Sequence, residues 1–230
     1  MRTTPSSPGS ECGQPIRDPS PRRRRASGAF GAGAHTLLQV ITSGQPEVPA
    51  EFLRALRSLR AAKLRPEVLL EEVPGPARIA PFSVALTADV VAGQSEEELA
   101  SGRFVVLHDP AGQESWDGTF RLVTFVRATL EPELGADAML AEVAWSWFED
   151  AVAGAGVVAH AASGTVTRVL SQSFGDLSDR PEEVEVEIRA SWTAPDGDLT
   201  PHLVAWADLL CQAAGLPPVP PGVTSIGPRR

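Results

Sequence analysis

A histidine, an aspartate and a tryptophan around one turn are the residues of this chain best placed for chemistry. His108 and Asp109 stand at the expected end of a strand, before a loop over 109–118 that contains Trp116. Loops at strand ends often carry functional groups, and a histidine can act as a general base. Adjacent strand residues point to opposite faces, so we do not expect Asp109 to orient His108. Trp116 is expected either to begin the next strand as a core residue or, if exposed, to anchor a partner.

The other chemistry-bearing residues do not form a recognisable catalytic or metal site. His160 and His202 are scattered along the chain without metal-ligand spacing. No serine has the Gly-x-Ser-x-Gly context, and no glycine-rich phosphate loop follows a strand. Cys211 lies in an apolar stretch far from Cys12, so we expect a small buried hydrophobe there. We therefore expect no catalytic residue, no cofactor and no metal, and lean against an enzyme.

A basic helix face is the one feature that suggests nucleic acid. Arg54, Arg57 and Arg60 recur on one side of a helix expected over 49–64. No aromatic residues alternate with these arginines to stack bases. The net charge of −9 also disfavours phosphate binding over the chain as a whole. Nucleic-acid binding is therefore an alternative that we do not favour.

Charge and composition divide the chain into one domain with two tails. Residues 1–45 hold six Arg against one Asp and one Glu and are rich in Ser, Pro and Gly, which predicts a disordered basic tail or a start site assigned too early. Residues 46–216 are expected to form one acidic domain, followed by a disordered Pro-rich tail over 217–230.

No apolar run reaches the roughly 18 residues of a membrane span. With a single Lys and no Tyr or Asn, the sequence indicates a GC-rich genome, and we expect a cytoplasmic protein.

The hydrophobic periodicity predicts an α+β fold. We expect an antiparallel sheet of about five to six strands with two to three helices packed on one face. In the strand near the end of the chain, Glu183, Glu185 and Glu187 face outward and are expected to pair across strands with Arg127 or Arg121. The expected elements are helices over 49–64, 138–153 and 200–214, strands over 68–73, 79–91, 104–107, 119–130, 164–174 and 182–192, and a capped turn or short helix over 95–100.

Two similar stretches suggest a duplicated strand–strand–helix unit. Val126-Arg127-Ala128 precedes Val143-Ala144-Trp145, and Ile188-Arg189-Ala190 precedes Val204-Ala205-Trp206. The spacing from Arg to Trp is 18 residues in the first stretch and 17 in the second. Matched tripeptides also arise by chance in a chain rich in Ala and Val, so this remains a hypothesis. It predicts that Trp145 and Trp206 are matched anchors in the core.

Several stretches of the chain resemble a known family. They are Phe52 to Leu56, Leu64 to Pro74, Ile79 to Leu86, Phe174 to Asp176 and Ile188 to Trp192. Together they resemble the uncharacterised family of high-GC bacteria known as the domain-of-unknown-function family numbered three thousand. The resemblance spans about 49–217. The family has no assigned activity, so the resemblance carries no catalytic residue over to this chain. The order of elements is also similar to that of the secretion-chaperone-like folds, which are small, acidic and often dimeric protein binders.

These observations favour a non-enzymatic protein-binding module of the adaptor or chaperone type, and they leave a homodimer open. The surface we expect to bind a partner or ligand includes His108, Asp109 and Trp116, with Arg54, Arg57 and Arg60 as the basic candidates. A small-ligand protein or enzyme using the 108–118 loop is the first alternative. An RNA-associated protein using the basic helix is the second.

Overall fold

The computed structural model describes residues 47–92 and 98–218. The tails predicted over 1–45 and 217–230 lie outside this part of the chain, apart from residues 217 and 218. The helices are α1 (Ala50–Ala61), α2 (Pro132–Gly135), α3 (Leu140–Gly154) and α4 (Thr200–Ala213), with a 3-10 turn, η1 (Gly175–Leu177). The strands are β1 (Val68–Val73), β2 (Phe82–Val91), β3 (Glu98–Gln113), β4 (Gly118–Leu130), β5 (His160–Ser171) and β6 (Glu183–Ala194).

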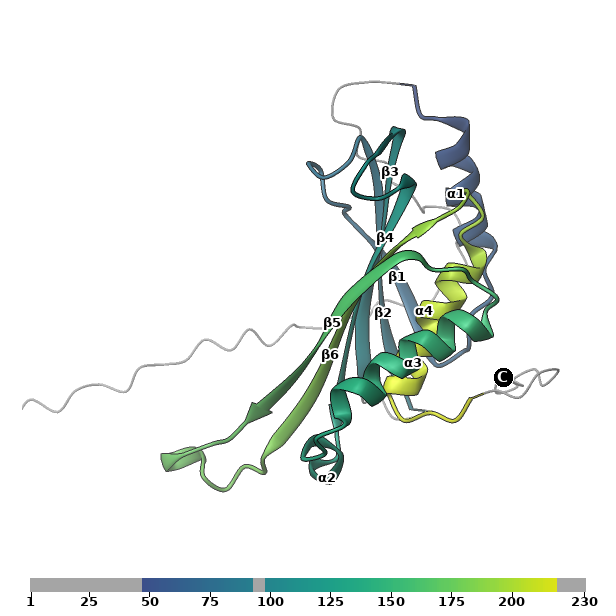
Figure 1. The fold of residues 1–230 in the computed structure, drawn as a ribbon. Coiled ribbons are helices and arrows are strands. Elements are labelled where there is room, and N and C mark those ends of the chain that lie inside the picture. Colours follow the sequence, from purple (N-terminus) through teal and green to yellow (C-terminus); the bar gives the residue numbers. More distant parts are fainter. Residues whose placement is uncertain (1–46, 93–97, 219–230) are drawn as a thin grey trace, which may run out of the picture. The chain divides into compact units, whose positions relative to one another are not determined.

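The six strands form one antiparallel sheet in the order β1-β2-β3-β4-β6-β5. The three long helices α1, α3 and α4 lie on one face of this sheet (Figure 1). Strand β6 shows why: Val184, Val186 and Ile188 are buried toward the helices, and the residues between them face the other way. The predicted α+β class, strand number and one-sided helix layer are confirmed. In the described part of the chain no helix covers the opposite face, which we call the helix-free face.

The arrangement of elements repeats across the middle of the sheet. Strands β3 and β4 are followed by α3, and β5 and β6 are followed by α4. Each helix packs on the strands of the other unit, α3 on β5 and β6, and α4 on β3 and β4. Each also places a tryptophan over a glycine of the sheet: a Cβ on Gly102 of β3 would lie 3.0 Å from Trp206 Cζ2, and one on Gly164 of β5 would lie 2.5 Å from Trp145 Cζ3. The lack of a side chain at these two glycines gives each indole room against the sheet.

Strand β3 is the element whose prediction was furthest wrong. The predicted turn or helix over 95–100 is strand from Glu98 onward, and its residues 95–97 lie outside the described part of the chain. Pairing with β2 and β4 extends the predicted short strand over 104–107 in both directions. The ladder to β4 is irregular only between His108 and Gln113, where Pro110 has no backbone N–H to donate. Most of the predicted loop over 109–118 is therefore the end of a long hairpin.

The remaining differences concern element ends and short elements. Helix α1 ends at Ala61, before the predicted end at residue 64, because Ala62 has an extended backbone. Strand β5 begins at His160, ahead of the predicted residue 164. The short elements α2 and η1 were not predicted. Across residues 47–92 and 98–218, no helix is both long and apolar enough to span a membrane.

Candidate functional site

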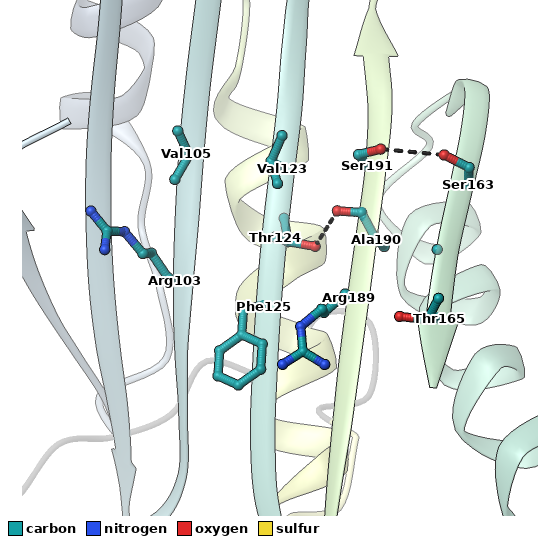
Figure 2. Close-up of a pocket in the computed structure, with 11 residues that line it drawn as sticks. Arg103, Val105, Val123, Thr124, Phe125, Ser163, Thr165, Arg189, Ala190 and Ser191 are labelled. Carbon is teal, nitrogen blue, oxygen red and sulfur yellow. Dashed lines mark hydrogen bonds between the residues drawn. The ribbon is translucent and has the colours of Figure 1, made fainter. Parts of the chain in front are cut away.

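The helix-free face contains a hollow of about 580 Å³ over β3, β4, β6 and β5. The strand register places its lining in two rows that run across the sheet. The first row is Val105, Val123, Ser191 and Ser163, and the second is Arg103, Phe125, Arg189 and Thr165. Figure 2 shows these side chains on neighbouring strands, with the helices behind the sheet. The volume of the hollow is in the range of small-molecule sites.

The floor of the hollow is apolar and partly open to solvent. Val123 is 39% exposed although β4 is a central strand with a neighbour on each side. Val105 and Phe125 next to it are half-buried. An antiparallel sheet that faces water normally carries polar residues on its solvent side. Contiguous apolar side chains on this face are therefore typical of a surface that another molecule covers.

Arginines border the apolar floor. The Arg189 guanidinium lies 5.0 Å from the centre of the Phe125 ring and forms an ion pair of 2.8 Å with Glu187. Arg103 is exposed and donates to the Pro74 carbonyl at 3.0 Å. Arginine heads of this kind recognise carboxylates in a fixed fork geometry. The rim is therefore suited to acidic groups although the domain as a whole is acidic.

Arg121 is a buried cation at the edge of the hollow. It is 9% exposed, and burial lowers the pKa of its guanidinium. Its Nη2 donates to Ser191 Oγ at 2.7 Å, and its Nη1 donates to the Ala161 carbonyl at 3.0 Å and to Thr193 Oγ1 at 3.1 Å. All of its acceptors in the described part of the chain are neutral, so no carboxylate offsets its charge there. The hydroxyls of Ser163 and Ser191, which line the hollow, therefore lie next to an unbalanced positive charge.

The outward row of Glu183, Glu185 and Glu187 forms the predicted cross-strand pair with one of the two candidate arginines. Arg127 Nε donates to Glu185 Oε1 at 2.8 Å across β4 and β6. This contact raises the pKa of Arg127. The other predicted partner, Arg121, bonds to the neutral acceptors described above. Among the described residues, Arg127 and Arg189 therefore have carboxylate partners, whereas Arg103 and Arg121 do not.

His108 lies in the core, so the prediction that placed it at a surface site is wrong for its side chain. It is fully buried, stacked on Phe120 with ring centres 4.1 Å apart and on Phe52 at 5.7 Å. Its Nδ1 lies 3.1 Å from the Thr119 carbonyl, and its Nε2 has no hydrogen-bond partner within residues 47–92 and 98–218. Burial lowers its pKa, which the bond to Thr119 opposes. The neutral imidazole therefore packs in the core among aromatic side chains.

Asp109 and Trp116 shape the β3–β4 hairpin. Asp109 accepts hydrogen bonds from the Ala111 N–H at 3.0 Å and from Gln113 Nε2 at 3.2 Å. Trp116 is 8% exposed, and its carbonyl accepts a hydrogen bond from the Thr193 hydroxyl. Of the two roles left open for Trp116, the structure matches the core residue. Neither side chain lines the hollow.

The three predicted basic residues lie on the exposed side of α1. Arg54 lies 3.9 Å from Glu51 on the same helix, so part of its charge is balanced locally. Arg57 and Arg60 are exposed one and two turns further along. Helix α1 lies on the opposite side of the sheet from the hollow (Figure 1), so these arginines do not join it. Their role in nucleic-acid binding stays a prediction.

One protein-family model matches this chain. Residues 48–224 match the family model described as a protein of unknown function, DUF3000. The chain belongs to the DUF3000 family. No curated protein and no solved structure matches this DUF3000 chain significantly. Among residues 47–92 and 98–218, no three His, Cys, Asp or Glu side chains are grouped to hold a metal ion.

Proposed function

We propose that this DUF3000 protein is a non-enzymatic protein-binding module, and that the helix-free face is its binding surface. The observation that carries the proposal is Val123, an apolar side chain 39% exposed in the centre of a six-stranded sheet. Removing such side chains from water is favourable by about 25 cal/mol per Å² of apolar surface, before the costs of association are subtracted. Phe125 and the arginines around it add the aromatic and guanidinium groups that are enriched at interface hot spots.

The chemistry around the hollow supports binding over catalysis. Ser163 and Ser191 interact with Arg121, a cation that has no basic atom to activate a hydroxyl. Burial raises the pKa of the Cys211 thiol to about 11, which makes it a poor nucleophile. Cys211 lies in the core on α4, as the sequence predicted.

A substitution in the floor of the hollow tests the proposal. The full chain and its Val123→Asp variant would each be used for affinity capture from the cells that make the protein, with nuclease at physiological salt. We expect Val123→Asp to lose the captured proteins, with a loss of affinity of about 30-fold or more, because a carboxylate would replace an apolar contact. Quantitative mass spectrometry measures the difference.

The matched control is Leu53→Asp on α1. Leu53 is 41% exposed, so the substitution adds the same charge at nearly the same exposure but on the helical side. We expect it to retain the captured proteins. Equal retention by both variants, or loss with Leu53→Asp alone, would show that the partner binds elsewhere.

A further inference from the structure

The hairpin that joins β5 to β6 ends in an exposed apolar tip over residues 172–183. Phe174 is 74% exposed and Leu177 is 48% exposed, although both are large hydrophobic residues. Figure 1 shows this hairpin extending away from the three long helices. Most of the Phe174 side chain stays in contact with solvent in the isolated chain, so the tip is suited to insertion into another surface.

The tip is also acidic. Residues 172–183 contain four carboxylates, Asp176, Asp179, Glu182 and Glu183, against the single cation Arg180. All four are exposed, and no described residue forms an ion pair with Asp176 or Asp179. The tip therefore combines an aromatic side chain with uncompensated negative charge. The hollow on the helix-free face has the complementary features, an apolar floor beside Arg103 and Arg121, which have no carboxylate partner among the described residues.

We propose that the hollow binds the β5–β6 tip of a second copy of this chain, so that the free protein is a reciprocal dimer. Phe174 lies on the floor formed by Val123 and Phe125, and the tip carboxylates lie near the arginines of the rim. A two-fold axis lets each copy insert its tip into the hollow of the other, which closes the assembly at two chains. The inference rests on the proposed function of the helix-free face, because it assigns one partner to that face.

The tip that enters a hollow must come from another copy. Glu183 begins β6 at the tip, and Arg189 lies at the hollow on the same strand, six residues away. At roughly 3.3 Å per residue the extended strand holds them about 20 Å apart. Residues 1–45 match the hollow less well by charge, because six Arg outnumber one Asp and one Glu there.

Sedimentation velocity of the full chain over a range of concentrations tests the dimer. We expect the wild-type chain to dimerise and Phe174→Ser to weaken the dimer about 30-fold or more, as expected for a central aromatic anchor. Because Phe174 is exposed, the monomer is expected to keep its fold, which circular dichroism checks. Leu134→Ser, at an exposed α2 position outside both the tip and the hollow, is the matched control and should leave the dimer unchanged.

A charge exchange tests the pairing itself. Arg103→Asp and Asp176→Arg are each expected to weaken the dimer about tenfold, and the two changes in one chain should restore it to within about threefold of wild type. A wild-type chain that stays monomeric, or a dimer unaffected by Phe174→Ser, overturns the inference. If Val123→Asp still loses captured proteins in that case, the proposed function stands and only the second copy is excluded.

Discussion

Trp206→Ala is expected to lower the free energy of unfolding by about 3–5 kcal/mol, the range for removing a large aromatic side chain from a core. Trp206 is 1% exposed, and its ring lies 5.5 Å from Phe104 between α4 and the sheet. Its Nε1–H also donates to the Phe125 carbonyl at 3.4 Å. Alanine would leave a cavity over Gly102, which has no side chain to fill it. Urea unfolding at neutral pH measures the loss, and the thermal midpoint should fall by roughly 10 °C.

Trp145→Ala provides the comparison within the same fold. Trp145 is the matching tryptophan over Gly164, but it is only half-buried, and its Nε1–H donates to Glu149 on the exposed side of α3. We expect a smaller loss of about 1–2 kcal/mol, because less apolar surface returns to water. Equal losses for the two variants, or a loss below about 1 kcal/mol for Trp206→Ala, would contradict the packing described here.

Acidification from pH 6.5 to pH 4 is expected to lower the free energy of unfolding by about 3 kcal/mol through His202 alone. His202 is 3% exposed, and its Nδ1 accepts a hydrogen bond of 2.9 Å from Trp192 Nε1–H. Burial lowers its pKa to about 4, which the charges of Asp196 and Asp198 oppose. The unfolded chain binds a proton below about pH 6.5, whereas the folded chain resists it until about pH 4. The contribution of His202 to the free energy of unfolding is therefore fully present above pH 6.5 and decreases as the pH falls toward 4.

His202→Gln removes the titration and keeps an acceptor for the Trp192 indole. Denaturant unfolding of both proteins at several pH values between 4 and 7 measures the two slopes. We expect the free energy of unfolding to fall less steeply with decreasing pH in the variant. The pH dependence that remains includes the contribution of His108, whose pKa burial also lowers. Parallel slopes in the two proteins would show that His202 is not the group responsible.

The fold could be predicted from the sequence where apolar and polar residues alternate regularly along a strand. In β6 the apolar residues at every second position predicted the strand, its exposed side and the cross-strand pair of Glu185 with Arg127. Strand β3 could not be predicted in full, because Gly102, Pro110 and Gly112 interrupt the pattern and the run before it resembles a helix cap. Pairing with β2 and β4 holds these residues in the sheet, and such long-range contacts leave no local signal.

The candidate site could be predicted only in part. Searching for reactive side chains led to His108, although Phe104, Val106 and His108 alternate along one strand and so share its buried face. A signal for the hollow was present in β4, where Val123 and Phe125 add apolar residues to the side that should face water. Joining those residues to Ser163 and Arg189 requires knowing that β6 lies between β4 and β5. That order has no local signal, because α3 and β5 lie between β4 and β6 in the sequence.

Photo-crosslinking from the floor of the hollow tests the central claim most directly. A benzophenone amino acid would replace Val123 in the full chain, and a second protein would carry it at Leu53 on α1, where exposure is nearly the same. Irradiation in the cell, followed by nuclease treatment and mass spectrometry, would identify what each position touches. We predict protein adducts at position 123, including at least one protein other than this chain, and none of these at position 53. Adducts only at position 53, or no protein adduct at position 123, would contradict a protein-binding role for the helix-free face.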